Sequence, residues 1–236
     1  MKLRLLPGLT WLVAVTTTLW VILLIVDQVA RPPIHTLSER IAALEANQAL
    51  FTINYLNAAL ITLFTVMLLA AYLTQLHDRS PLWTAIGAAF VPMYGLANLA
   101  VYLLQIFVVP GLLDLYHQPE TTLLGETLLG LALHDWPGSA AGFVNALAYA
   151  ALGVASLVVG LLLSRGRGLL RAGGGLLALS GGFSLAALFG LRVPALAALT
   201  LVSGAVYLLA LVLLGIELTR RPEALSLPPD SAPVGA

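Results

Sequence analysis

Four polar side chains recur along an apolar stretch that runs from Pro81 to Pro110. They are spaced by four, four and three residues, as Tyr94, Asn98, Tyr102 and Gln105. On an α-helix this spacing places all four on one face. Phenols and side-chain amides form hydrogen bonds, and hydrocarbon offers them no partner. If the stretch crosses a bilayer, this face must therefore turn towards other helices or a wet cavity.

Catalytic patterns are weak in the rest of the chain. His134 and Asp135 could act as a base with its orienting carboxylate. Side chains of adjacent residues rarely point the same way, so we favour a turn at a membrane interface. We expect Asp27 to be an interfacial carboxylate exposed to water. The chain has no cysteine, and its four histidines show no metal-ligand spacing. We therefore expect no cofactor and no metal site, and we favour a non-enzymatic role.

The composition defines the class of protein. Hydrophobic residues make up 60% of the chain and charged residues only 9%, whereas a soluble domain carries about 25% charged residues. Such a chain cannot cover a surface that faces water, so it belongs in a lipid bilayer. The formal net charge is zero, which gives no electrostatic reason to expect nucleic acid as a partner.

The apolar stretches predict an all-α polytopic membrane protein with a bundle of six transmembrane helices. The predicted spans cover residues 5–28, 50–76, 82–110, 140–163, 172–190 and 194–218. We expect these spans to form a single domain over residues 1–221. Residues 222–236 are rich in proline and small residues, and we predict a disordered cytoplasmic tail there.

Two connections carry helical patterns of their own. Thr36 and Glu39 have the spacing of a capping box, which predicts a helix that begins near Leu37. Its apolar positions recur at helical spacing, and we place Arg40 elsewhere on its surface. Leucines at helical spacing also predict a short extracytoplasmic interfacial helix over residues 120–133, which is too short to span a bilayer.

The fifth predicted span has a small residue at every fourth position. The stripe consists of Gly174, Ala178, Gly182, Ala186 and Gly190. Small residues let a neighbouring backbone approach closely in a membrane. We therefore expect Gly182→Leu to destabilise the fold, and we expect Leu177 to face lipid or a softer contact.

The distribution of lysine and arginine predicts the orientation, because positive charge collects on the cytoplasmic side. With six spans and both termini cytoplasmic, eight basic residues lie inside: Lys2, Arg4, Arg79, Arg165, Arg167, Arg171, Arg220 and Arg221. Three lie outside: Arg31, Arg40 and Arg192. The connection over residues 111–139 is then extracytoplasmic, and we expect a multi-pass protein of a bacterial-type cytoplasmic membrane.

This orientation places the polar side chains at a common depth. We expect them to surround one outward-facing pocket, with Asn98 as its floor. The candidate ligand-binding residues are Asp27, Asn54, Asn57, Tyr94, Asn98, Tyr102, Gln105, Asn145 and Tyr149. Amides in membrane helices also serve as simple hydrogen-bonding links between helices, so each of them has a packing alternative.

Three functions remain open from the sequence. The first is binding or passage of a small polar molecule or a lipid headgroup through the outward-facing pocket. The second is a structural or assembly subunit of a membrane complex, and the third, which we favour least, is a membrane-embedded enzyme. The lipid bilayer is the expected partner, a homo-oligomer is possible although no pattern indicates it, and the ligand's identity stays open.

Overall fold

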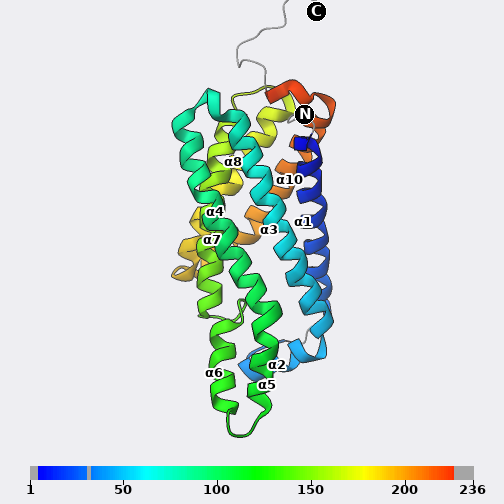
Figure 1. The fold of residues 1–236 in the computed structure, drawn as a ribbon, viewed down its shortest axis with the longest axis vertical. Coiled ribbons are helices and arrows are strands. Elements are labelled where there is room, and N and C mark those ends of the chain that lie inside the picture. The colour runs from blue at the N-terminus through cyan, green and yellow to red at the C-terminus, as the bar shows by residue number, and fades with distance from the viewer. Residues whose placement is uncertain (1–4, 31–32, 226–236) are drawn as a thin grey trace, which may run out of the picture. The chain divides into compact units, whose positions relative to one another are not determined.

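The computed structural model describes residues 5–30 and 33–225, and its regular elements are all helical (Figure 1). Six helices are long and apolar enough to cross a membrane. They are α1 (Leu5–Ala30), α3 (Gln48–Leu76), α4 (Pro81–Leu103), α7 (Ala140–Leu163), α8 (Gly168–Leu188) and α10 (Leu199–Arg220). The prediction of an all-α polytopic membrane protein with six spanning helices is confirmed.

Shorter elements connect or extend the six long helices. They are α2 (Leu37–Ala46), η2 (His77–Arg79), the π-helix η3 (Leu104–Val108), α5 (Val109–His117), α6 (Thr122–Ala132), η4 (Phe189–Leu191), α9 (Pro194–Ala197) and η5 (Pro222–Leu225). The capping box that starts α2 is present, with the Glu39 backbone N–H donating to Thr36 Oγ1 over 3.2 Å. The predicted interfacial helix is α6, which begins two residues later and ends one residue earlier than expected.

Most of the predicted span boundaries differ from the structure by a few residues, and three of the differences change how the chain is connected. The third span continues through η3 and α5 as far as His117, so residues 111–117 are helical rather than part of a loop. The sixth span begins at Leu199, after the separate turn α9. Pro222–Leu225 is a short helix where we expected the disordered tail to begin, and residues 226–236 of that tail lie outside the described residues. Pro194 stands at the first position of α9, where proline suits a helix start, and Pro110 stands in the first turn of α5, directly after the π-helix.

The chain forms two compact units, each held together by contacts among its own residues. The first unit contains the described parts of Met1–Val15, Phe64–Tyr94 and Tyr149–Ala236, and the second contains Thr16–Leu63 and Gly95–Ala148. Helices α1, α3, α4 and α7 each contribute residues to both units. The single domain predicted over residues 1–221 stays a prediction.

In the first unit, α7 and α8 approach at glycines. A Cβ atom added at Gly181 would lie 2.5 Å from the Gly153 carbonyl oxygen, and one added at Gly160 would lie 2.3 Å from the Ala178 nitrogen. A small-residue face on α8 is therefore real, but Gly182 is not on its contacting side, because a Cβ there meets no atom within 4 Å. We expected Gly182 to lie at a packed contact and Leu177 to face lipid or a softer contact. Both expectations are wrong, because Gly182 lies away from the contact and Leu177 is buried. The contacting residues of α8 are Gly174, Ala178 and Gly181, which are spaced by four and then three residues rather than by four throughout.

Hydroxyl groups link α8 to α10 in the same unit. Ser203 Oγ donates to the Ser180 carbonyl oxygen over 2.9 Å, and Ser180 Oγ donates to the Ser203 carbonyl oxygen over 3.0 Å. The hydroxyls of Ser184 and Ser203 are 2.7 Å apart. Serines hydrogen-bond across membrane helices in this way where small residues let the backbones come close, so the cluster is accounted for by packing.

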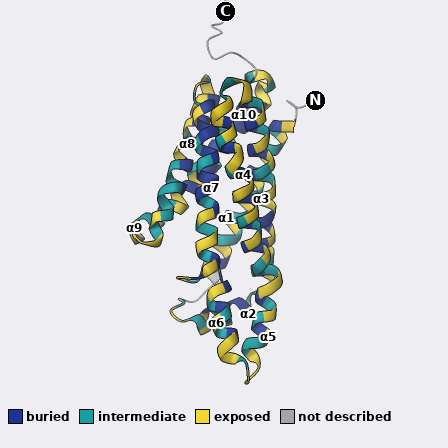
Figure 2. Cartoon of the chain, turned by 60° about the vertical axis from the view of Figure 1, so that its left-hand side comes forward, coloured by how far each residue is buried: buried dark blue, intermediate teal, exposed yellow. Residues whose placement is uncertain are grey.

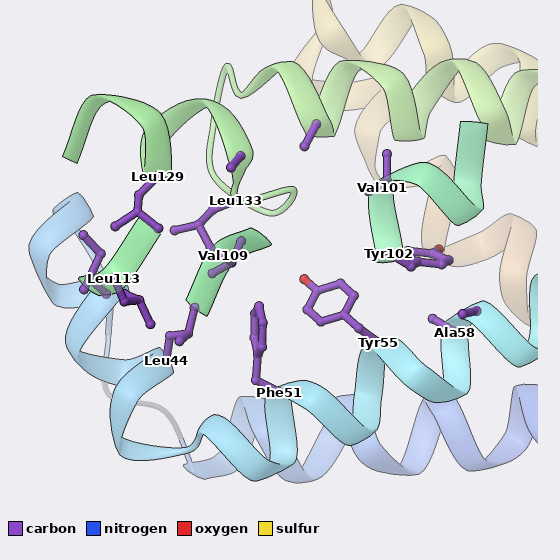
Figure 3. Packing of buried hydrophobic residues seen from close by; sticks show 14 residues of the cluster. Leu44, Phe51, Tyr55, Ala58, Val101, Tyr102, Val109, Leu113, Leu129 and Leu133 are labelled. Atoms are coloured by element: carbon purple, nitrogen blue, oxygen red, sulfur yellow. The ribbon is translucent and has the colours of Figure 1, made fainter. Parts of the chain in front are cut away.

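A buried hydrophobic cluster holds the second unit together. Figure 3 shows Phe51 and Tyr55 extending from α3 towards Val109 and Leu133, with Leu44, Leu113 and Leu129 closing the far side. By contrast, the outer face of α1 exposes apolar side chains along its length, visible as yellow segments in Figure 2. A continuous apolar surface of this kind suits lipid rather than water.

Candidate functional site

The second unit contains a set of polar side chains that make contact across several elements, all of them buried except the half-buried His134. It comprises Tyr55 and Thr62 of α3, Asn98 and Tyr102 of α4, Gln105 of η3 and His134 of the loop after α6. We call these six residues the polar core. Asn98, Tyr102 and Gln105 come from the polar face predicted on the third span, and all four residues of that face, Tyr94 included, are buried. The polar face of the third span thus turns into the protein.

Gln105 lies in the π-helix and uses both ends of its amide. Its Nε2 donates to the Ala132 carbonyl oxygen over 2.8 Å, and its Oε1 accepts the His134 backbone N–H over 3.4 Å. The side chain is fully buried. Two backbone groups at the end of α6 are therefore satisfied by Gln105, which supports the packing alternative at this position.

Tyr55 and His134 form a hydrogen-bonded pair. The Tyr55 hydroxyl lies 2.6 Å from His134 Nδ1, and the two rings meet edge to face with their centroids 5.3 Å apart. The Tyr102 ring lies 6.0 Å from the Tyr55 ring and 6.4 Å from the His134 ring, centroid to centroid. Aromatic rings thus surround this polar contact between α3 and the loop.

Asp135, next to His134 in sequence, binds a different partner. Arg40 Nε lies 3.2 Å and 3.1 Å from the two Asp135 carboxylate oxygens, and Arg40 Nη2 lies 2.9 Å from Oδ2. Arg40 is only 3% exposed, and its guanidinium stands over the Phe51 ring at 5.8 Å. The placement of Arg40 on the surface of α2 is wrong. It lies three residues after Leu37 and four before Leu44, on the apolar face of the helix, and this spacing was the available signal.

The side-chain amide of Asn98 has a hydrogen-bond partner at its nitrogen but none among the described residues at its oxygen. Its Nδ2 donates to Thr62 Oγ1 over 3.0 Å, while the Thr62 hydroxyl donates its single proton to the Ala58 carbonyl oxygen over 2.9 Å. Thr62 Oγ1 can therefore only accept from Asn98, and this fixes which end of the amide faces it. Asn98 is 1% exposed, and its Oδ1 has no hydrogen-bond partner among the described residues.

The remaining predicted amides fall into two kinds. Asn57 donates from Nδ2 to the Thr16 carbonyl oxygen over 3.1 Å, which links α3 to α1. Asn54 and Asn145 are half-buried, and the Oδ1 atom of each is buried without a partner in the described part of the chain. Asn57 therefore has a packing role, whereas Asn54 and Asn145 share the free acceptor seen at Asn98.

Asp27 and the two remaining tyrosines complete the predicted set. Asp27 is 6% exposed near the end of α1, so the expectation of a carboxylate exposed to water is wrong. Tyr94 and Tyr149 pack on each other in the first unit, with ring centroids 6.5 Å apart. Sequence reasoning grouped these two with the polar core because helix spacing alone does not show where one packing unit ends.

No family model, no curated protein and no solved structure matches this chain.

Proposed function

We propose that this membrane protein binds a small polar molecule or a lipid headgroup at the polar core of its second unit. The observation that carries the proposal is the free Oδ1 of Asn98. A buried acceptor without a partner costs about 1–3 kcal/mol. A leucine at the same position would avoid that cost, so a binding role, in which a ligand supplies the donor, accounts for the asparagine.

The wider setting supports this site. Asn98 lies on the same helical face as Tyr102 and Gln105, beneath the aromatic rings that surround His134. We place the loop that follows α6 on the extracytoplasmic side, from the eight-to-three distribution of basic residues. A ligand would then enter from outside and reach Asn98 at the deepest point of the core.

A structural or assembly role is the second candidate, and two observations favour it. Gln105 and Asn57 each bond backbone groups of neighbouring segments, as amides that only link helices do. On this alternative Asn98 is a third link of the same kind, through Thr62, and its removal should weaken the bundle.

Asn98→Leu separates the two candidates. The variant removes the free acceptor and keeps the volume roughly constant, so on the binding proposal its melting temperature in detergent should equal or exceed that of the parent. On the assembly alternative the melting temperature should fall, because the lost link to Thr62 then outweighs the removal of the free acceptor. Asn57→Leu is the matched control, because it breaks a link to backbone and should lower the melting temperature in either case.

A second measurement tests access. The chain has no cysteine, so Asn98→Cys introduces its sole thiol. An impermeant maleimide added outside intact cells should label this variant, as it should label the exposed loop control Gln118→Cys. A marked loss of stability in Asn98→Leu together with an unreactive Asn98→Cys thiol would leave only the assembly role.

A further inference from the structure

The free atoms of the buried side-chain amides in the second unit all have one polarity. Among the buried side-chain amides that the structure describes, the atoms without partners are the oxygens of Asn54, Asn98 and Asn145, and none is an amide nitrogen. Thr62 fixes this orientation for Asn98. The site therefore offers acceptors, and the group that complements it must donate hydrogen bonds.

Two of these acceptors stand one helical turn away from residues of a single buried cluster in the second unit. Val101 and Tyr102 of α4 and Ala141 of α7 belong to one buried cluster, and the two helices run in opposite directions through it (Figure 1). Asn98 is one turn before Tyr102, and Asn145 is one turn after Ala141. Four residues along an α-helix span about 6 Å, and because the two helices are antiparallel, both of these steps lead in the same direction.

Charge limits the ligand further. An anion would need a free cation, but the guanidinium of Arg40 is already paired with Asp135. A buried cation would need a carboxylate, because an unpaired charge is expensive in a medium of low dielectric. Asp27 is eleven residues beyond Thr16, whose carbonyl binds Asn57, and at 1.5 Å per residue that is about 16 Å along α1. A neutral ligand therefore fits the site better than an anion or a cation.

We infer that the ligand is a neutral, hydroxyl-bearing molecule, either a small polyol or the hydroxylated headgroup of a neutral lipid. Its hydroxyl protons are donated to Asn98 Oδ1 and Asn145 Oδ1. A hydroxyl group donates a hydrogen bond without carrying a charge. Its oxygen can stay without a hydrogen-bond partner at a lower cost than an unpaired amide carbonyl oxygen. This inference rests on the proposed binding function and specifies the ligand class for that same site.

The test uses the purified full-length chain in detergent and compares melting temperatures with and without matched probes. Monooleoylglycerol carries two hydroxyl groups, oleylamine carries an ammonium group, and methyl oleate carries only acceptors. Monooleoylglycerol should raise the melting temperature of the parent by several degrees, and methyl oleate should not. The rise should disappear in Asn98→Leu and in Asn145→Leu, and it should persist in Asn57→Leu although that variant starts from a lower value.

Free glycerol distinguishes a polyol from a lipid headgroup. Glycerol stabilises proteins in general because it is excluded from their surfaces, so only the difference between parent and Asn98→Leu counts. A difference with glycerol indicates a soluble polyol, and a difference with monooleoylglycerol alone indicates a lipid headgroup.

Two outcomes would overturn the inference. One is a larger Asn98-dependent rise with oleylamine than with monooleoylglycerol, which would mean a cationic ligand and leave the binding function intact. The other is the absence of any Asn98-dependent rise with the hydroxylated probes. In that case the labelling of Asn98→Cys decides separately whether the binding function also fails.

Discussion

The amide of Gln105 holds the end of α6 through two backbone groups, the Ala132 carbonyl and the His134 N–H. Gln105→Leu should leave both groups without a partner in a buried position, at a cost of about 1–3 kcal/mol. We expect a lower melting temperature and faster proteolysis of the loop over residues 133–139.

Gln105→Glu provides the matched control for that prediction. A carboxylate can still accept the His134 N–H but cannot donate to the Ala132 carbonyl unless it is protonated. The variant should therefore recover stability as the pH is lowered, whereas Gln105→Leu should not. Equal melting temperatures for the parent and Gln105→Leu would contradict a stabilising role for this amide.

At the residue level, helix spacing predicted burial better than it predicted partners. The four-four-three spacing from Tyr94 to Gln105 indicated a face turned away from lipid, and all four residues are buried. The partners came from distant segments, such as Thr62 for Asn98 and the loop after α6 for Gln105. No local pattern encodes such pairings, because they depend on how separate helices are set against one another.

The pairing of α7 and α8 gives a prediction at the level of elements. Gly181→Ala places a methyl group 2.5 Å from the Gly153 carbonyl oxygen and 2.7 Å from the Leu157 nitrogen, both backbone atoms that cannot move aside cheaply. The variant should lower the melting temperature markedly or fail to fold. Gly182→Ala meets nothing within 4 Å and should be neutral or stabilising by up to about 1 kcal/mol, because alanine favours helix over glycine.

Thermal unfolding of the two alanine variants in one detergent checks this directly. They differ by one position in sequence and have identical composition, so differences in expression or hydrophobicity do not enter. If Gly182→Ala proves the more damaging of the two, the packing described for α8 is wrong.

The start of α2 gives a prediction about pH. The backbone N–H groups of His35 and Thr36 donate to Glu39 Oε2 over 2.6 Å and 3.0 Å, and these bonds, that from His35 foremost, hold the pKa of the Glu39 carboxyl below its ordinary value. A lowered pKa in the folded state means that the carboxylate's contribution is complete above the ordinary pKa of glutamate. It is lost as the pH falls through the lowered value.

The amide protection factors in α2, in which the pH dependence of intrinsic exchange is divided out, should therefore fall on acidification through that range. In Glu39→Gln the amide oxygen can still accept both N–H groups but does not titrate, so this fall in protection should vanish. A ¹³C titration of the Glu39 carboxyl that gives an ordinary or raised pKa would refute the capping interaction.

Element types were predictable where the sequence carries a strong local signal. The capping box at Thr36, the apolar lengths of the six spans and the leucine spacing of α6 all have a direct physical meaning within one segment. The π-helix and the continuation into α5 were missed, because Pro110 reads as a helix end. In the structure Pro110 stands at the beginning of α5, where its missing N–H costs little.

For the whole molecule the orientation is the main prediction. With eight basic residues on one side and three on the other, we expect both termini in the cytoplasm. Reporter fusions after Arg171 and after Arg221 should give cytoplasmic signals, and a fusion at Gln118, between α5 and α6, should give an external one. A cytoplasmic signal at Gln118 would reverse the proposed entry side of the ligand.

The π-helix over Leu104–Val108 also bears on how this chain can tolerate changes in length. A π-turn closes its hydrogen bonds five residues apart, as between the Leu104 carbonyl and the Val109 N–H, and so contains one residue more than an α-turn. Deleting Ile106 should therefore convert the π-turn into an α-turn while α5 keeps its facing, because the π-turn accommodates just this one extra residue. A deletion within a regular α-helix would instead turn everything beyond it by about 100°, so a single-residue deletion should be tolerated better at this turn than elsewhere in the same span.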